Sequence, residues 1–433
     1  MIQLNKRRDG CYMDTKVFET YESEVRSYCR RFPTVFKKAV GSYFYDENDE
    51  KYLDFFNGAG ALNYGHNNPY IKEKVLEYIA NDGIIHSLDM YTVAKREFID
   101  YMENTILKPR NMDYKILFPG PTGTNAVETA LKLARKVKGR PQVWAFMGAF
   151  HGMTLGSLAL TTDKGARQGG GVALNDVKHM PAPYMFKDLD TIAYMQTLLD
   201  DDHSGYEKPA AIILETVQAE GGIHVFEVEW LQALREFCTK NDILMIVDDI
   251  QVGCARTGTF FSFERADIMP DIFVMSKSIG GYGFPLALTF LKPELDVFKP
   301  GEHNGTFRGN QIAFIAAKAA LEFMLENKVE AETTRKGELE KKFLEEEILP
   351  LDSRLAVRGL GLMWGIDFSD LPDPQFTSKV QKYCFDHKLV IECAGRKDSV
   401  LKTMPALTIS DEDLTKGLTI LKEAIAKTLE EIE

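Results

Sequence analysis

Six short apolar runs, separated by helical patterns and Gly-rich turns, constrain the fold more than any other feature of this sequence. They span residues 115–118, 143–146, 211–215, 243–248, 272–275 and 286–291. Strands that alternate with helices form a mostly parallel sheet that helices cover on both faces. The sequence therefore predicts an α/β fold built around one large sheet.

The sequence pattern changes twice along the 433 residues, and these changes indicate the domain organisation. Residues 1–50 mix aromatic and charged side chains, whereas residues 51–310 hold the alternating strands and helices. Residues 311–433 open with a helical stretch, predicted over 313–347, and continue with a strand-like run at 360–368. We expect residues 51–310 to form a large domain, and residues 1–50 and 311–433 to form a smaller α+β domain.

Two of the apolar runs end near side chains of opposite charge. Asp248 closes the run 243–248, and Lys277 stands just beyond the run 272–275. A lysine and an aspartate at the ends of neighbouring buried strands suit pyridoxal phosphate. The lysine can form a Schiff base with that cofactor, and the aspartate can keep the pyridine nitrogen protonated. Because Lys277 must be neutral to react, we expect its pKa to lie below the usual value of about 10.4.

A turn of small residues precedes a predicted helix and offers a place for an anion. Gly123 and Thr124 follow the run 115–118, and the apolar stripe of the helix begins near Asn125. Backbone N–H groups at a helix start, together with the helix dipole, favour a phosphate group. The same residues also fit an ordinary helix cap, so both interpretations stay open at this point.

Three further polar segments stand at strand ends or before a helix. Phe150 and His151 follow the run 143–146, and Phe150 could stack on a flat cofactor or pack in the core beside a structural histidine. Glu215 and Glu220 place two carboxylates at another strand end, and residues 303–310 form a polar, Gly-rich loop. Each segment taken alone fits a structural role as well as a functional one.

Charge and cysteine pattern exclude several classes of protein. The formal net charge of −12 argues against a nucleic-acid partner and against an anionic membrane surface. No run approaches the roughly 18 to 20 apolar residues of a membrane span, and the basic residues 1–8 are not followed by the apolar run of a signal peptide. The six cysteines, Cys11 among them, are scattered without a C-x-x-C pair. We therefore expect a cytoplasmic protein with reduced thiols and without a metal centre.

In this order, the motifs resemble those of the class III aminotransferases, the fold type I pyridoxal-phosphate family that includes 4-aminobutyrate, ornithine and acetylornithine enzymes. The resemblance runs from residues 54–58 and 64–69 to residues 405–409, which is nearly the whole chain. It implies that residues 51–310 form a cofactor-binding domain around a mostly parallel seven-stranded sheet. It also implies a homodimer, or a higher homo-oligomer, with active sites at the interface.

The resemblance assigns the reactive end of the cofactor site. Lys277 matches the Schiff-base lysine, and Asp248 matches the partner of the pyridinium nitrogen. Gln251 matches the residue near the phenolic oxygen of the cofactor.

The resemblance also assigns the phosphate end. Gly123 and Thr124 match the phosphate-binding turn, and Phe150 matches the ring that stacks on the cofactor. Thr306 matches a threonine that reaches the phosphate of the neighbouring subunit.

Two positions depart from the family pattern and bear on the substrate. Met153 stands at the position where 4-aminobutyrate enzymes have an arginine that binds a distal carboxylate. A methionine has no charge for such a carboxylate, so this position is poorly suited to bind one. Lys402 aligns with the arginine that usually binds the α-carboxylate of glutamate, with Arg308 or Arg396 as alternative cations. Glu220 matches the glutamate that masks or unmasks this cation in several ω-aminotransferases, and it could also receive an ammonium group.

Within the family, residues 118–128, 276–283 and 301–310 look closest to the diaminobutyrate–2-oxoglutarate aminotransferases of ectoine biosynthesis. That resemblance implies an amino transfer from L-glutamate to L-aspartate 4-semialdehyde, an amino-aldehyde acid, which gives L-2,4-diaminobutyrate and 2-oxoglutarate. The alternatives are a class III enzyme for siderophore or polyamine diaminobutyrate, ornithine or 4-aminobutyrate, an aminomutase of the same fold, and a non-catalytic binding protein. The intact Lys277 and Asp248 speak against the last of these.

Overall fold

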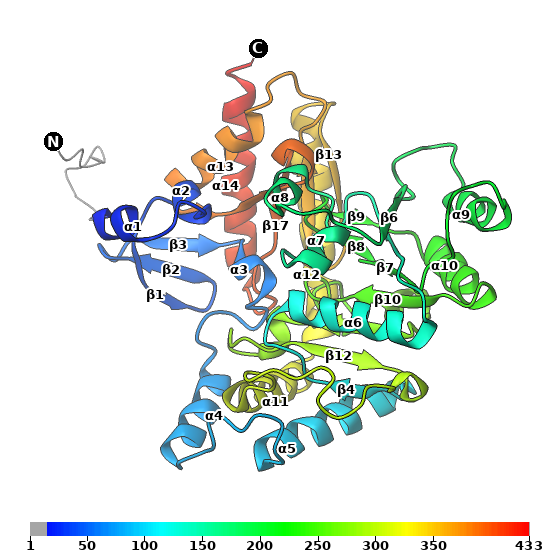
Figure 1. The fold of residues 1–433 in the computed structure, drawn as a ribbon. Coiled ribbons are helices and arrows are strands. Elements are labelled where there is room, and N and C mark those ends of the chain that lie inside the picture. The colour runs from blue at the N-terminus through cyan, green and yellow to red at the C-terminus, as the bar shows by residue number, and fades with distance from the viewer. Residues whose placement is uncertain (1–14, 433) are drawn as a thin grey trace.

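A computed structural model describes residues 15–432, and its centre is a seven-stranded sheet with the order β4-β12-β11-β10-β7-β5-β6 (Figure 1). In chain order the strands are β4 (Lys115–Leu117), β5 (Val143–Phe146), β6 (Val177–Met180), β7 (Ala211–Leu214), β10 (Leu244–Asp248), β11 (Ile272–Met275) and β12 (Leu288–Leu291). Strand β12 runs antiparallel to both of its neighbours, and the other pairs in the sheet are parallel. The predicted α/β fold with a mostly parallel sheet is confirmed. Cys11 and residues 1–8 lie outside the described residues.

Helices cover both faces of this sheet, as its side-chain pattern requires. Alternate side chains of a strand point to opposite faces. Leu244 and Ile246 of β10 pack in the apolar cluster of α6 (Gly123–Lys138). Met245 and Val247 pack in the larger cluster that includes α10 (Val228–Lys240). A strand buried on both sides must be apolar throughout, which explains the continuous apolar runs of the sequence.

The six apolar runs all lie in strands of this sheet, with small differences at their ends. Strand β6 was not predicted. Two consecutive polar residues, Lys178 and His179, stand in its middle, and it pairs only with β5 at the edge of the sheet. An edge strand is half exposed and therefore lacks the fully apolar pattern of the central strands.

Two predictions for the C-terminal third were wrong in extent. The single helix expected over 313–347 is two helices, α11 (Gln311–Glu326) and α12 (Val329–Phe343), followed by a π-helical turn at Leu344–Ile348. The helix breaks because Lys328 adopts a left-handed conformation with φ 49°. The strand expected over 360–368 is β14 (Trp364–Asp367), since Leu360 N–H donates to the Met363 carbonyl in a tight turn before it.

Two smaller sheets complete the fold. The first has the order β13-β14-β17-β16; α13 (Phe376–Asp386) packs beside it, and α14 (Asp411–Leu429) packs on α13. Its further strands are β13 (Ala356–Gly359), β16 (Glu392–Ala394) and β17 (Val400–Thr403). The second joins β1 (Phe36–Val40), β2 (Tyr43–Asp46), β3 (Lys51–Asp54) and β15 (Leu389–Val390). The proposed domain boundaries at residues 50 and 310 stay a prediction.

The remaining α-helices are short, and the remaining two strands form one hairpin. They are α1 (Lys16–Tyr21), α2 (Tyr28–Arg31), α3 (Asn57–Gly60), α4 (Pro69–Ala80), α5 (Val93–Tyr101), α7 (Leu155–Leu160), α8 (Lys164–Gln168), α9 (Thr191–Asp200), β8 (Val217–Gln218) and β9 (His224–Val225). None of the helices within residues 15–432 is both long enough and apolar enough to span a bilayer.

Candidate active site

The candidate site lies at the carboxyl edge of the large sheet. Asp248 is the last residue of β10, and Lys277 follows the neighbouring parallel strand β11. Phe150 and His151 follow β5, and Glu215 follows β7. Segments far apart in the sequence meet here because the carboxyl ends of parallel strands share one edge of a sheet.

A cavity of about 170 Å³ opens at this edge. Its walls are Gly123, Thr124, Phe150, His151, Gly152, Glu215, Glu220, Asp248, Ile250, Gln251, Val252 and Lys277. All the predicted site residues except Thr306 and Lys402 therefore line one cavity. A concave site with a few convergent polar groups is the usual form of a small-molecule binding site.

Lys277 is held in an unusual conformation. Its φ is 53°, in the left-handed region that side chains other than glycine rarely adopt. Burial lowers the pKa of the Lys277 amine, and the charge of Lys402 acts in the same direction, while Glu220 opposes both. The amine is thus shifted toward the neutral form that a nucleophile or a proton acceptor needs.

Asp248 and His151 form a buried pair at the other side of the cavity. His151 Nδ1 donates to Asp248 Oδ2 over 2.7 Å, and Ile250 N–H donates to Asp248 Oδ1 over 3.2 Å. Burial opposes a charge on the imidazole, but the hydrogen bond and the charge of Asp248 raise the pKa of His151. The role of His151 as the partner of Asp248 was missed from the sequence, where only its place beside Phe150 at a strand end drew attention to it.

The start of α6 forms the end of the cavity. Thr122 and Asn125 form a capping box, so the helix starts at Gly123, two residues earlier than the apolar stripe indicated. A Cβ atom at Gly123 would lie 2.9 Å from Ile250 Cδ1, so only glycine fits there without a shift. Thr122 caps the helix while Gly123 and Thr124 line the cavity, so the cap is present and phosphate binding at this turn stays a prediction. The free N–H groups of the first turn can bind an anion there.

Glu215 links two loops, one that contains Phe150 and one that contains Ala219. Its Oε1 accepts from Phe150 N–H over 3.0 Å, and its Oε2 accepts from Ala219 N–H over 3.4 Å. Burial raises the pKa of Glu215 to about 7. The Phe150 ring remains partly exposed and forms one wall of the cavity.

Lys402 lies behind the cavity wall and reaches the cavity only through Glu220. It is fully buried, and its Nζ donates to Glu220 Oε1 over 2.6 Å. Gln251 Nε2 donates to the same oxygen over 3.0 Å. A second carboxylate, Glu392, lies 3.0 Å from Lys402 Nζ. Burial alone would lower the pKa of Lys402, but these two glutamates raise it well above its usual value. Despite burial, Lys402 and Lys277 lower the pKa of Glu220 to about 2.

Thr306 and the two alternative cations lie outside the cavity of this chain. Thr306 is exposed on the loop before α11, where its carbonyl accepts from His86 Nε2 over 2.8 Å. Arg308 is bonded within the same loop, to the His303 carbonyl. Arg396 is exposed, with its guanidinium 5.8 Å from the centre of the Tyr184 ring.

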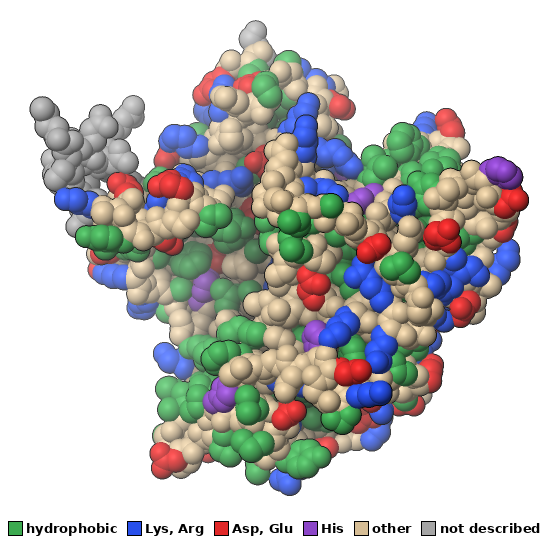
Figure 2. All heavy atoms as spheres, in the orientation of Figure 1, with side chains coloured by type: hydrophobic (Ala, Val, Ile, Leu, Met, Phe, Trp, Pro, Cys, Tyr) green, Lys and Arg blue, Asp and Glu red, His purple; other side chains and the backbone are tan. Residues whose placement is uncertain are grey.

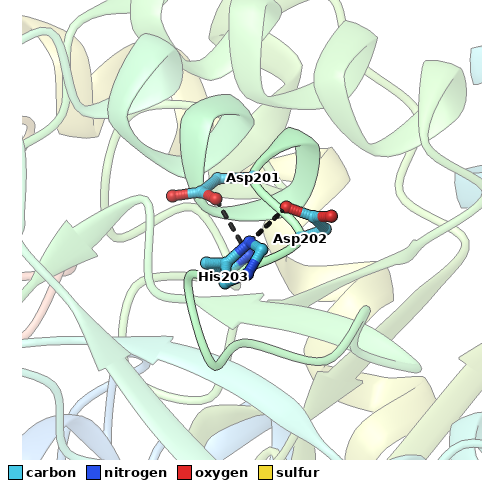
Figure 3. A group of neighbouring side chains, drawn as sticks. All are labelled: Asp201, Asp202 and His203. Carbon is cyan, nitrogen blue, oxygen red and sulfur yellow. Dashed lines mark hydrogen bonds and ion pairs between the residues drawn. The ribbon is translucent and has the colours of Figure 1, made fainter.

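One group of potential metal ligands occurs within residues 15–432, and it is unrelated to the cavity. Asp201, Asp202 and His203 follow α9 on the surface, with their side chains turned toward one another (Figure 3). His203 Nδ1 donates to Asp202 Oδ1 over 2.6 Å. All three residues are exposed, and such acidic groups are common on surfaces without any ion.

Comparison with known protein families agrees with the geometry of this site. Residues 26–425 match the sequence model of the class-III aminotransferases. The chain belongs to the class-III aminotransferase family.

Among its relatives, a diaminobutyrate–2-oxoglutarate transaminase of Streptomyces coelicolor is 52% identical over 423 residues, which cover 96% of this chain and 98% of that protein. A protein of the same name from Halalkalibacterium halodurans is 51% identical over 96% of this chain and 97% of its own length.

Solved structures of transaminases share the fold. An S-selective transaminase from an Arthrobacter species superposes with a TM-score of 0.85, over 96% of this chain and 97% of that one, at 23% identity. The ornithine aminotransferase of Toxoplasma gondii superposes with a TM-score of 0.82, over 96% and 94% of the two chains, at 24% identity. At such identities the likeness concerns the fold alone.

Proposed function

We propose that this chain is a pyridoxal-phosphate-dependent ω-aminotransferase that moves an amino group from L-glutamate to L-aspartate 4-semialdehyde, giving L-2,4-diaminobutyrate and 2-oxoglutarate. The observation that carries this proposal is the presence of Lys277 and Asp248 in one cavity beside a helix start. The substrates are taken from the relatives of the same length, such as the 52% identical protein of Streptomyces coelicolor.

The cavity offers what pyridoxal phosphate requires. Lys277 would hold the aldehyde carbon, Asp248 the pyridine nitrogen, and the start of α6 at Gly123 and Thr124 the phosphate. Phe150 would cover one face of the ring. When bound, this cofactor supplies an electron-poor ring that stabilises negative charge on the substrate carbon and carries the amino group between the two substrates.

The protein residues would then bind, orient and move protons. Neutral Lys277 can take a proton from the substrate carbon and return it, because burial disfavours its charged form. Asp248, oriented by His151, places a negative charge where it favours a protonated ring nitrogen. Gln251 Oε1 is buried without a hydrogen-bond donor among the described residues, so it is available to a hydroxyl group in the cavity.

A homodimer forms part of the proposal, with Thr306 of each subunit serving the cavity of the other. Large apolar side chains are exposed between α4 and α5, at Ile84, Ile85, Leu88, Met90 and Tyr91. Figure 2 shows hydrophobic side chains gathered at the lower left of this face, in the region of α4 and α5. The patch adjoins the Thr306 loop, since His86 contacts both the Thr306 carbonyl and the Phe307 ring. Monomers rarely expose large apolar patches, so a partner subunit is expected to cover this one.

We also place the enzyme in the cytoplasm, without a nucleic-acid or membrane partner. The five cysteines within residues 15–432 are all free, and four of them are buried. Free buried thiols suit a reducing compartment.

Two measurements test the function. The purified protein should absorb visible light after incubation with pyridoxal phosphate, and Lys277→Ala should lose both this absorption and amino transfer. A coupled assay with L-glutamate and L-aspartate 4-semialdehyde should show turnover that exceeds the rates with ornithine and 4-aminobutyrate. A protein that stays colourless with the cofactor would contradict the proposal. Faster turnover of ornithine would identify ornithine as the preferred substrate in place of the one proposed. Turnover without a second keto acid would indicate an aminomutase.

A further inference from the structure

The ammonium group of Lys402 is shared by two carboxylates that differ in their exposure. Its Nζ lies 2.6 Å from Glu220 Oε1 and 3.0 Å from Glu392 Oε2. The Glu220 side chain is 30% exposed and lines the cavity, whereas the Glu392 side chain is 5% exposed and lies behind the wall. Only Glu220 can therefore contact a molecule in the cavity.

Glu392 is fixed in place by the sheet. It stands directly across from Lys402 in the antiparallel pair of β16 and β17, where opposite charges attract across the strands. Its Oε1 accepts from the Tyr28 hydroxyl over 3.1 Å, and the Tyr28 ring packs against Phe56 with 4.9 Å between centroids. Glu392 is thus a permanent neighbour of Lys402.

Glu220 stands in a turn beside the cavity, not in a strand. It lies in the turn between β8 and β9, and its carboxylate is bonded to the side chains of Lys402 and Gln251. Rotation of the Glu220 side chain breaks these contacts without any change in the sheet. Glu220 therefore has open space into which it can turn away from Lys402, whereas Glu392 is enclosed, with 5% of its side chain exposed.

The net charge of Lys402 and its two glutamates depends on the position of Glu220. With both glutamates in place, one lysine and two carboxylates carry a net charge of about −1. When Glu220 turns away, Lys402 and Glu392 together are close to neutral. In surroundings that exclude water such charges act strongly on one another and on a ligand. As long as Glu392 stays beside it, Lys402 presents a balanced charge to the cavity.

We propose that Glu392 is a specificity-determining residue, which neutralises Lys402 and so favours substrates with a second ammonium group over dicarboxylates. This inference rests on the proposed function and deepens it. A diamino acid can place its second ammonium beside Glu220, which remains negative. Glutamate and 2-oxoglutarate must displace Glu220 to reach Lys402, and they meet a lysine whose charge Glu392 already balances.

The variant Glu392→Gln tests this inference, because it keeps the size and one acceptor oxygen of the side chain and removes its charge. We expect the KM for glutamate and for 2-oxoglutarate to fall about tenfold and the KM for 2,4-diaminobutyrate to rise several-fold, with kcat within about twofold of wild type. Glutarate, a dicarboxylate with no amine or keto group, should bind the holoenzyme about tenfold more tightly by calorimetry. Glu392→Met provides a second uncharged variant, and Glu392→Asp should stay close to wild type.

The matched control is Glu340→Gln. Glu340 is another fully buried carboxylate, and it accepts from Thr403, the residue after Lys402, without contacting Lys402 itself. Unchanged KM ratios and glutarate affinity in Glu392→Gln, or equal shifts in Glu340→Gln, would overturn the inference. If wild type does not transaminate glutamate, the proposed function fails, and the glutarate comparison still decides the role of Glu392.

Discussion

The imidazole of His151 donates a hydrogen bond from Nδ1 to Oδ2 of Asp248 over 2.7 Å, and both side chains are buried. The two residues are brought together from the ends of β5 and β10, which are not adjacent in the sheet. Because His151 holds one oxygen of Asp248, it sets the direction of the carboxylate toward the cavity. His151 therefore acts as a positioning residue for Asp248.

Removing this donor should impair catalysis without abolishing it. We expect His151→Ala to lower kcat by about ten- to a hundredfold, the scale of one hydrogen bond to a charged group. The pH midpoint of the visible absorption of the bound cofactor should also shift, because Asp248 loses the partner that stabilises its negative charge. His151→Asn can still donate a hydrogen bond and should recover part of both effects. An identical absorption midpoint in wild type and His151→Ala would contradict the positioning role.

Thr306 should affect cofactor retention rather than folding. Its side chain is exposed in the single chain, so Thr306→Ala should leave the melting temperature of the apoprotein unchanged. If the hydroxyl reaches the phosphate of the partner subunit, cofactor affinity should fall by about 1 to 2 kcal/mol. Thr306→Ser keeps the hydroxyl and serves as the control. Light scattering should show a dimer for all three proteins, and a fully active monomer would rule out the shared site.

Lys402 should affect both the KM for substrates with a second carboxylate and the stability of the fold. Lys402→Met leaves Glu220 and Glu392 without their cation, which should destabilise the protein by about 3 to 5 kcal/mol. The double variant Lys402→Met with Glu392→Gln should recover much of this loss. In that background we expect the KM for glutamate to rise about tenfold relative to Glu392→Gln alone, and uncharged amine donors to change little. Unchanged glutamate kinetics would leave Arg308 or Arg396 as the cation that binds the α-carboxylate.

Glu340 should make stability depend on pH. Burial raises the pKa of Glu340 to about 7, and its Oε2 has no hydrogen-bond partner among the described residues. The folded state then binds a proton that the unfolded state has lost, so this contribution to stability is present below pH 4.5 and disappears as the pH rises through 7. Glu340→Gln mimics the protonated acid, so its stability relative to wild type should increase by about 1 to 3 kcal/mol between pH 5 and pH 8.

Thermal unfolding across that pH range measures the Glu340 effect. The control is Glu338→Gln, the same change at an exposed position of the same helix. A stability difference between Glu340→Gln and wild type that stays constant from pH 5 to pH 8 would show that Glu340 is ionised throughout.

The sheet and the position of Lys277 and Asp248 in one cavity were predictable because they depend on local patterns. Buried central strands are apolar at every position, and Lys277 and Asp248 stand at the ends of two such strands. Strand ends in a parallel sheet converge, so their proximity follows from the fold class. The family resemblance then supplied the roles that no pattern could.

Other contacts depend on three-dimensional features that have no local signal. The pairing of Glu392 with Lys402 follows from the register of two short strands, and a shift by one residue would turn the two side chains to opposite faces. The break between α11 and α12 occurs at Lys328, a residue that normally continues a helix, so the left-handed conformation there could not be foreseen. In both cases long-range packing overrides the local preference.

The sheet that joins β3 to β15 has a consequence for synthesis on the ribosome. Leu53 of β3 pairs with Leu389 of β15, which is made 336 positions later. At about 5 to 20 residues per second, the edge of β3 that faces away from β2 stays unpaired in the nascent chain for roughly 17 to 70 seconds. During that time its free backbone groups and the side chains of Tyr52 and Phe55, buried in the finished protein, are open to other chains. The nascent protein therefore keeps an exposed strand edge, which favours aggregation, until its last 50 or so residues emerge.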